Sequence, residues 1–338
     1  MATTATATKE TDGAGALDRL IAATLPEMEK VNALILARAD SHVDMVPELA
    51  RYLIEAGGKR LRPMLTVAAA LLVGKSNGDH VKFAAAVEFL HNATLLHDDV
   101  VDESDMRRGR PAARMVWGNQ ASVLVGDFLL GQAFMMMVET ANVPALNVIA
   151  KAATIIAEGE VFQLSKAGDL TTTAEDYRVV IGAKTATLFE AATEVGAMAG
   201  GADEAGRTAL RVYGRELGLA FQLVDDVLDY RGEAGKMGKN SGDDLREGKM
   251  TLPVILAIAE CNPAEREIIT NSLGKADAND AALQQVVAIL NRYNTLSRTL
   301  QQADAHVQAA RDALAPLPAS EMKTLLSDIA EFYVSRAY

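Results

Sequence analysis

The sequence contains two copies of the pattern Asp-Asp-x-x-Asp, in which two adjacent aspartates are followed by two other residues and a third aspartate. The first copy runs from Asp98 to Asp102 and the second from Asp225 to Asp229. On an α-helix, residues i and i+4 share a face and lie about 6 Å apart along the axis. The outer carboxylates of each copy therefore point the same way, and leaving such charges unpaired beside an apolar helix is costly.

These two copies, here called the first and second acidic motifs, have the ligand chemistry of a magnesium site. Magnesium retains several waters and is typically bound by one or two carboxylates together with substrate phosphates. Two motifs facing one another could thus hold a diphosphate through metal ions. The alternative is that each motif is a solvated helix end, but two copies, each ending an apolar helix and preceding a basic loop, favour the metal site.

Basic residues occur where a diphosphate site needs them. The segment Gly57–Pro63 is a glycine turn that carries Lys59, Arg60 and Arg62 into a predicted helix. Helix N-termini and nearby Lys or Arg side chains bind phosphate groups well. Five further basic residues follow an acidic motif or begin a predicted helix: Arg107, Arg108, Lys184, Lys239 and Lys249. Each alone is more often a surface charge, but their placement around two acidic motifs favours an anion site.

Helical periodicity dominates the elements that must position these residues, so we predict an all-α fold. No 20–50-residue repeat and no Pro/Ser-rich linker divides the chain. We therefore expect a disordered tail at residues 1–15 and one domain at residues 16–338. The predicted helices are Ala16–Ala39, Pro47–Ala56, Pro63–Val73, Asp79–Val101, Ala121–Thr140, Ala145–Leu164, Ala174–Ala199, Glu204–Tyr230, Thr251–Ala259, Pro263–Leu273, Asp280–Arg292, Thr295–Leu314 and Ser320–Arg336.

The composition of the 338 residues agrees with close-packed helices, since 49% are hydrophobic and only 5% aromatic. The net charge of −12 argues against nucleic acid as a partner. The single cysteine, Cys261, excludes a disulfide within the chain and indicates a reducing, cytoplasmic location. No apolar run reaches the roughly 18 residues typical of a membrane span. The Ala/Thr/Gly-rich leader lacks the apolar core of a signal peptide.

At this level of detail the chain resembles the trans-isoprenyl diphosphate synthases, in particular the long-chain type that makes octaprenyl, solanesyl or decaprenyl diphosphate. The resemblance rests on Gly57–Pro63, His97–Gly109, Phe221–Tyr230, Gly238–Asn240 and Gly242–Lys249, and it extends over nearly the whole chain after about residue 15. It implies an isoprenoid-synthase helical bundle around a deep central cavity and a homodimer. It also implies repeated addition of isopentenyl diphosphate to an allylic diphosphate such as farnesyl diphosphate, for the side chain of ubiquinone.

The resemblance further assigns roles to the matching residues. Two or three magnesium ions are expected on Asp98 and Asp102, with Asp99 in a supporting role, and on Asp225, Asp226 and Asp229, mainly through Asp225. Isopentenyl diphosphate is expected to bind Lys59, Arg62, His91 and Arg108. The allylic diphosphate is expected to face Arg107, Lys184, Thr185, Gln222, Lys239 and Lys249. The expected catalytic set is Asp98, Asp99, Asp102, Lys184, Asp225 and Asp226, which would neutralise the charge that develops on the departing diphosphate.

Product length is predicted from the helix that precedes the first acidic motif. The positions five and four residues before Asp98 are Ala93 and Thr94, both small. In relatives with shorter products, aromatic side chains near these positions block the cavity, so we expect chains longer than fifteen or twenty carbons. We propose Phe134, on the next helix, as the floor of the cavity, although ordinary core packing is the alternative. Phe89 lies on the opposite helix face and is discounted as a plug.

Two other classes of function stay open at this stage. A class I terpene cyclase also combines an all-α cavity with an aspartate motif and magnesium, but its second metal motif normally mixes Asn, Ser and Glu. A non-enzymatic helical scaffold would bind no diphosphate. The apolar product implies at most transient contact with a bilayer. The number of additions, the preferred allylic starter and the downstream use of the product are not readable from the residues.

Overall fold

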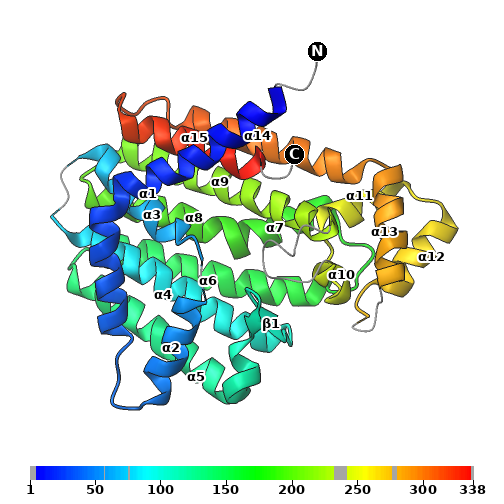
Figure 1. The fold of residues 1–338 in the computed structure, drawn as a ribbon, viewed down its shortest axis with the longest axis horizontal. Coiled ribbons are helices and arrows are strands. Elements are labelled where there is room, and N and C mark those ends of the chain that lie inside the picture. Colours follow the sequence, from blue (N-terminus) through cyan, green and yellow to red (C-terminus); the bar gives the residue numbers. More distant parts are fainter. Residues whose placement is uncertain (1–4, 57, 75–76, 232–241, 276–279, 336–338) are drawn as a thin grey trace.

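The computed structural model describes residues 5–56, 58–74, 77–231, 242–275 and 280–335, with side chains from residue 15 onward. Within these ranges the fold is a bundle of helices with one two-stranded hairpin, which confirms the all-α prediction (Figure 1). The helices are α1 Ala5–Arg38, α2 Met45–Glu55, α3 Leu61–Val73, α4 Asp79–Val101, α5 Ala113–Glu139, α6 Val143–Lys166, α7 Ala174–Ile181, α8 Thr187–Ala199, α9 Glu204–Arg231, α10 Asp243–Arg246, α11 Leu252–Glu260, α12 Pro263–Ser272, α13 Asp280–Arg292, α14 Thr295–Ala313 and α15 Glu321–Ser335.

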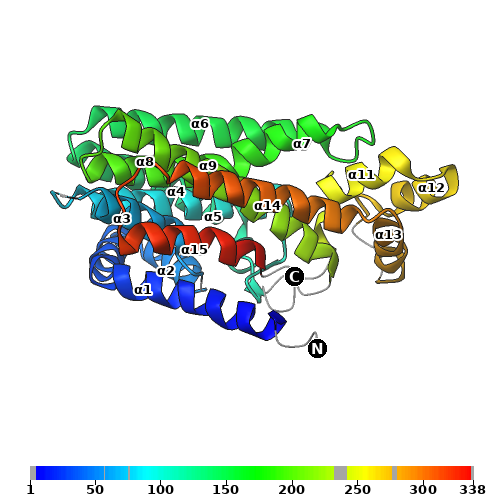
Figure 2. The same ribbon diagram turned by 90° about the horizontal axis from the view of Figure 1, so that it is seen from above.

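The long helices lie in layers, with α6 on one side of the bundle and α1 on the other (Figure 2). Between them, α4 packs against α3, α5 and α8, and α9 packs against α8 and α14. Phe83 and Phe89 on α4 are fully buried, as are Phe189 on α8 and Tyr213 on α9. Since α4 and α9 each end in an acidic motif, the core of the bundle fixes where both motifs lie.

Two glycines let the central helices approach closely. A Cβ at Gly196 of α8 would lie 2.3 Å from the carbonyl oxygen of Thr66 on α3. A Cβ at Gly214 of α9 would lie 2.5 Å from the carbonyl oxygen of Phe189 on α8. No real side chain tolerates such distances, so glycine sets the spacing of α3, α8 and α9 at these crossings.

Several elements differ from the sequence prediction. The helix α1 begins at Ala5, inside the segment expected to be a disordered tail. The helix α5 begins at Ala113 instead of Ala121, because two helical pieces meet across a kink at Gly118, whose φ is 85°. The predicted helix 174–199 is interrupted by a π-helical segment, η1, at Gly182–Ala186.

Two short elements follow the acidic motifs and were not predicted. After the first motif, β1 Met106–Arg107 pairs antiparallel with β2 Arg110–Pro111. After the second motif, α10 forms a single turn at Asp243–Arg246. Strands of two residues and helices of four carry too little periodicity to be recognised from sequence. Both elements nevertheless place charged residues beside the motifs.

Among the described helices, α5 alone is long and apolar enough by composition to cross a membrane, although no such apolar run was expected. Core helices of globular proteins pass the same test. Here α5 packs along α4 through Val125, Leu129, Ala133 and Met136, all buried. Core packing therefore explains the apolar residues on one face of α5, whereas Leu124, Met135 and Val138 on the helix stay exposed.

Candidate active site

Residues from both acidic motifs line one cavity. Asp102 contributes from the end of α4, and Asp225 and Asp226 contribute from α9. The remaining polar lining includes residues of η1, α9, α10 and the segment after α10: Lys184, Thr185, Gln222, Asp244, Glu247, Lys249 and Thr251. The structure thus brings together most of the residues that the sequence predicts for metal ions and the allylic diphosphate. Lys239, another predicted contact, lies outside the described residues.

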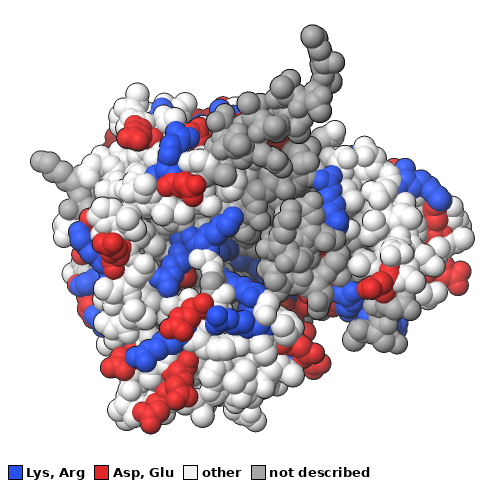
Figure 3. All heavy atoms as spheres, in the orientation of Figure 1, with Lys and Arg blue, Asp and Glu red and all other residues white. Residues whose placement is uncertain are grey.

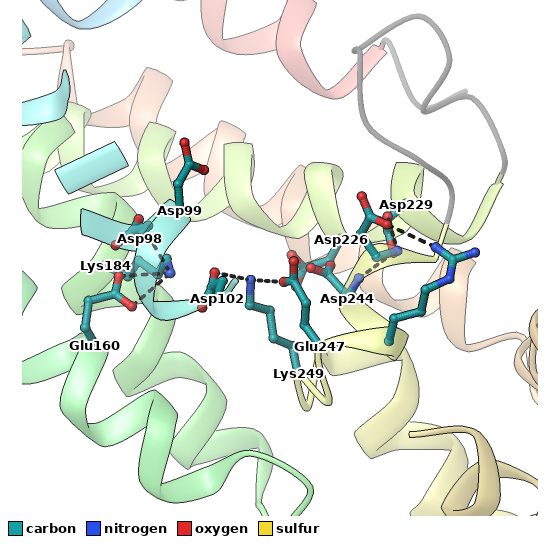
Figure 4. Close-up of polar contacts among 12 residues, drawn as sticks. Asp98, Asp99, Asp102, Glu160, Lys184, Asp226, Asp229, Asp244, Glu247 and Lys249 are labelled. Carbon is teal, nitrogen blue, oxygen red and sulfur yellow. Dashed lines mark hydrogen bonds and ion pairs between the residues drawn. The ribbon is translucent and has the colours of Figure 1, made fainter. Parts of the chain in front are cut away.

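The first motif faces a lysine on each side. The Lys184 ammonium lies 3.9 Å from Oδ2 of Asp98 and 2.9 Å from both carboxylate oxygens of Glu160 on α6 (Figure 4). Burial and the neighbouring Asp102 raise the pKa of Asp98, whereas Lys184 opposes the rise. The carboxylates of Asp98 and Glu160 are therefore held close together by a shared cation.

A second lysine makes the matching contact at the end of α4. The Lys249 ammonium donates to Oδ2 of Asp102 at 2.9 Å and also to Glu247 (Figure 4). Burial favours the neutral acid, but Lys249 and Lys184 outweigh it and lower the pKa of Asp102. Asp102 is thus an ionised carboxylate that points into the cavity, as a metal ligand must.

Asp99, the middle residue of the first motif, turns away from the cavity. It is fully buried, and its Oδ1 accepts hydrogen bonds from Nε and Nη2 of Arg107 on β1, the former at 2.8 Å. This pair ties the hairpin to the end of α4, in agreement with the supporting role predicted for Asp99. Arg107, predicted to face the allylic diphosphate, is engaged by this carboxylate instead.

The second motif is organised by hydrogen bonds around Asp226. The Tyr177 hydroxyl donates to Oδ2 at 2.6 Å, and Nε2 of Gln222 donates to Oδ1 at 2.7 Å. Thr185 in turn donates to Oε1 of Gln222 at 2.7 Å. Burial, with a contribution from the nearby Asp244, raises the pKa of Asp226 to about 8. Burial therefore opposes ionisation of Asp226, whereas the hydrogen bonds from Tyr177 and Gln222 favour it.

Asp229, the last residue of the second motif, caps the following turn. Its carboxylate accepts backbone N–H groups of Gly242, Asp243 and Asp244 at 3.2–3.3 Å. This contact fixes α10 next to α9 and places Asp244 in the cavity lining. The roles of Asp226 and Asp229 as metal ligands stay predictions, since both are already bound by protein donors in this fold.

The carboxylates present fit hard divalent cations. Asp98, Asp102, Asp225 and Asp244 come from the two motifs and α10, and all supply oxygen ligands. Within the described ranges no three acidic, histidine or cysteine side chains are grouped closely enough to form an all-protein metal site. Magnesium suits such an arrangement, because substrate phosphates and water complete its coordination.

A second group of basic residues surrounds the turn before α3. Nη1 of Arg62 lies 3.3 Å from Nε2 of His91, and the Arg62 guanidinium lies 4.4 Å from the centroid of the Phe189 ring. The Lys59 ammonium lies 5.5 Å from the Phe332 ring on α15. A Cβ at Gly58 would lie 2.9 Å from Nη1 of Arg108, so glycine allows this guanidinium to approach the turn.

This cluster has the electrostatics of an anion site. Burial lowers the pKa of His91 far below its ordinary value, and Arg62 and Arg108 lower it further. Burial likewise lowers the pKa of Arg62 to about 10. Lys and Arg side chains also gather near the middle of the face that carries β1 (Figure 3). The structure therefore groups Lys59, Arg62, His91 and Arg108, the residues predicted for isopentenyl diphosphate.

The predicted chain-length residues lie along α4 and α5. Ala93 is buried, and Thr94 is half-buried with its hydroxyl donating to the carbonyl oxygen of His91 at 2.9 Å. Phe134 is partly buried and packs against the core. Phe89 is fully buried. Nothing in these contacts tests a role in product length.

Four residues of the site were missed at the sequence level: Glu160, Tyr177, Asp244 and Glu247. Asp244 and Glu247 lie within the segment Gly242–Lys249 that supported the resemblance, which is a signal that could have identified them. Glu160 and Tyr177 belong to helices without any acidic motif. Only the packing of α6 and α7 against η1, which itself packs on α9, brings them to the site.

Comparison with known proteins gives a family match over most of the chain. Residues 43–290 match the family model described as polyprenyl synthetase. The octaprenyl diphosphate synthase of Haemophilus influenzae is 44% identical over 93% of this chain and 95% of its own length. That of Escherichia coli is 42% identical over 95% of this chain and 99% of its own length.

Solved structures agree with this match. A polyprenyl synthase from Caulobacter crescentus, complexed with calcium and isoprenyl diphosphate, superposes with a TM-score of 0.92 at 49% identity and covers 95% of this chain and 98% of its own. A decaprenyl diphosphate synthase from Rhodobacter capsulatus superposes with a TM-score of 0.91 at 50% identity, covering 95% of this chain and 99% of its own. The resemblance inferred from the motifs is confirmed.

Proposed function

Since the chain belongs to the polyprenyl synthetase family and is a long-chain all-trans-polyprenyl diphosphate synthase, we propose that it adds isopentenyl diphosphate repeatedly to farnesyl diphosphate with magnesium as cofactor. The observation that carries the proposal is that both acidic motifs line one cavity with Lys184 and Lys249 between them. This arrangement combines the anionic metal ligands and the basic diphosphate contacts that the reaction requires.

The residues of the cavity have separate tasks in the reaction. Magnesium, when bound, would neutralise negative charge on the allylic diphosphate as its C–O bond breaks. Asp98 and Asp102 from the first motif and Asp225 from the second would hold the ions. Lys184 and Lys249 would donate hydrogen bonds to the same diphosphate, and charge-assisted bonds of this type stabilise the developing charge.

The basic cluster before α3 would orient the second substrate. Lys59, Arg62 and Arg108 supply cationic donors for the diphosphate of isopentenyl diphosphate, and His91 remains neutral because burial and the arginines depress its pKa. The attacking double bond would then face the allylic cation. The proton released on coupling would pass to the departing diphosphate, the nearest base that the two substrates bring.

We propose decaprenyl, octaprenyl or solanesyl diphosphate as the product. The relatives and solved structures cited above carry octaprenyl and decaprenyl names, and Ala93 and Thr94, just before the first motif, are both small residues. Use of the product for the ubiquinone side chain, a cytoplasmic location and at most transient bilayer contact through the product belong to the same proposal. Two or three magnesium ions per site are expected from the family resemblance.

We also propose that the enzyme is a homodimer that pairs through α5 and α6. Leu124, Met135 and Val138 lie along one stripe of α5 after the kink at Gly118, and each is at least half exposed, as is Val116 before the kink. Val143 and Val161 on α6 are about as exposed. A second copy of the chain is the occupant that best explains so much apolar surface on two adjacent long helices.

Incubation with farnesyl diphosphate, magnesium and radiolabelled isopentenyl diphosphate tests the activity. We expect label in long prenyl products that chromatography resolves by chain length. Release of a hydrocarbon from farnesyl diphosphate alone would instead identify a terpene cyclase. Absence of both products, with the protein folded, would refute the proposal.

A further inference from the structure

Two glutamates outside the acidic motifs each bind one of the site lysines. Glu160 on α6 contacts the Lys184 ammonium at 2.9 Å through both carboxylate oxygens, and Glu247 after α10 contacts the Lys249 ammonium. Each lysine also reaches one outer aspartate of the first motif, Lys184 towards Asp98 and Lys249 towards Asp102 (Figure 4). Each ammonium is therefore shared between one motif aspartate and one separate glutamate.

The backbone around Glu160 is built to place it against Lys184. A Cβ at Gly159 would lie 2.5 Å from the Cβ of Ala183 in η1, so only glycine lets α6 approach so closely. The π-helical segment also presents Lys184 one position out of the register of α7 and α8. Close approach and register change together bring the glutamate and the ammonium into contact.

A turn at Gly248 places Glu247 against Lys249. Gly248 between them has a φ of 73°, in the left-handed region that favours glycine. Its carbonyl oxygen accepts the Gly168 N–H at 3.0 Å, and the Lys249 N–H donates to the carbonyl oxygen of Asp244 at 2.9 Å. Because these hydrogen bonds fix the turn, the side chains of Glu247 and Lys249 can contact one another on either side of the glycine.

A carboxylate beside a diphosphate site is unfavourable by itself, because it repels the anion. Glu160 and Glu247 are largely buried, with side chains 19% and 25% exposed, so water screens this repulsion only partly. When divalent cations occupy Asp98 and Asp102, the lysines lose one of their two anionic partners. The glutamates are the partners that remain to hold each ammonium in the cavity.

We propose that Glu160 and Glu247 are positioning residues that orient Lys184 and Lys249 towards the allylic diphosphate once metal ions occupy the first motif. The inference rests on the proposed function, since it assumes that an allylic diphosphate binds between the motifs. The glutamates act through the lysines and bind neither metal nor substrate.

The test compares Glu160→Gln and Glu247→Gln with the wild type and with Glu158→Gln, an exposed neighbour on α6. Glutamine keeps an oxygen acceptor for the lysine but removes the charge. We expect the KM for farnesyl diphosphate to rise about tenfold in each site variant, while the KM for isopentenyl diphosphate and the magnesium concentration for half-maximal activity stay unchanged. A tenfold change corresponds to about 1.4 kcal/mol.

Calorimetric titration with farnesyl thiolodiphosphate, whose C–S bond resists ionisation, supplies a readout independent of turnover. Both site variants should bind it about tenfold more weakly in the presence of magnesium. Equal or tighter binding would overturn the inference, because the carboxylates would then only repel the anion. A raised magnesium requirement would also overturn it, since the glutamates would then be metal ligands.

A double-mutant cycle separates positioning from simple stabilisation of the fold. Glu160→Gln added to Lys184→Met should not weaken analogue binding beyond the effect of Lys184→Met alone, because the glutamate acts through the lysine. Additive losses would contradict the inference. If one glutamate variant fails to fold, the other tests the same idea independently. Failure of the wild type to elongate farnesyl diphosphate would refute the proposed function, whereas an active wild type with unaffected variants would refute only this inference.

Discussion

Because the pKa of Asp226 is raised in the folded state, the metal-free protein should become less stable as the pH rises. The folded-state pKa of this carboxyl group is raised to about 8, mainly by burial, against an ordinary value of 3.8. Below pH 3.8 Asp226 is protonated in both the folded and the unfolded chain, so it makes stability no function of pH there. Between pH 3.8 and 8 the unfolded chain releases the proton while the folded chain keeps it, so increasing pH favours unfolding.

The magnitude follows from the width of this pH window. Each pH unit inside the window costs about 1.4 kcal/mol of stability. Raising the pH from 5 to 7 should thus cost about 2.7 kcal/mol through Asp226. For a chain of this size, each kcal/mol shifts the melting temperature by roughly 2 °C, so the expected shift is about 5 °C.

The assay is thermal unfolding in a chelator at pH 5, 6 and 7, comparing the wild type with Asp226→Asn. Asparagine cannot ionise, and its carbonyl oxygen still accepts the Tyr177 hydroxyl. Other titrating groups are common to both proteins, so the difference between their melting temperatures isolates Asp226. The wild type should lose about 5 °C relative to the variant across this range. Asp18→Asn, at an exposed position of α1, should follow the wild type.

Parallel curves for the wild type and Asp226→Asn would refute the reasoning. They would mean that Asp226 is ionised in the folded protein or that its burial is relieved by water. Addition of magnesium with inorganic diphosphate should reduce the pH effect, because divalent cations stabilise the ionised carboxylate. An effect of the same size with and without these ions would argue against metal binding near Asp226.

Three further changes test packing, product length and assembly. Gly196→Ala should lower the free energy of unfolding by about 1–3 kcal/mol in urea titrations, since its Cβ would meet the Thr66 carbonyl oxygen at 2.3 Å. An unchanged urea midpoint of unfolding would show that α3 and α8 separate freely. Phe134→Ala should lengthen the products on chromatography, and an identical distribution would remove Phe134 as the floor. Leu124→Glu should convert a dimer into a monomer in light scattering, because it buries a charge in the proposed interface; an unchanged mass would place the interface elsewhere.

Much of the fold could be predicted because its helices are long and periodic. The sequence predicts α4 at its observed bounds, Asp79–Val101, where a glycine precedes the helix and the first motif ends it. The segment η1 could not be predicted, because a π-helical register has no distinct hydrophobic period. Its position depends on α6, whose Gly159 meets Ala183 from a distant part of the chain.

The site could be predicted where the functional residues lie close together in a short sequence motif. Asp102 and Asp225 line the cavity, and Asp98, one helical turn before Asp102, lies 3.9 Å from the lining residue Lys184. The resemblance favours Asp225 over Asp226 as the main metal ligand, but the residues themselves give no physical reason for the difference. Only the fold shows that Tyr177, 49 residues away, donates to Asp226 and that burial raises the pKa of this carboxyl group. Long-range contacts of this kind separate residues that look equivalent in sequence.

The most direct test of the whole account is calorimetric binding of farnesyl thiolodiphosphate with magnesium and with a chelator. The account predicts strong binding with magnesium, little binding in the chelator, and loss of the magnesium-dependent part in both Asp102→Asn and Asp225→Asn. Binding that is unchanged by the chelator, or that survives either substitution, would contradict the claim that the two motifs hold one diphosphate jointly through divalent ions.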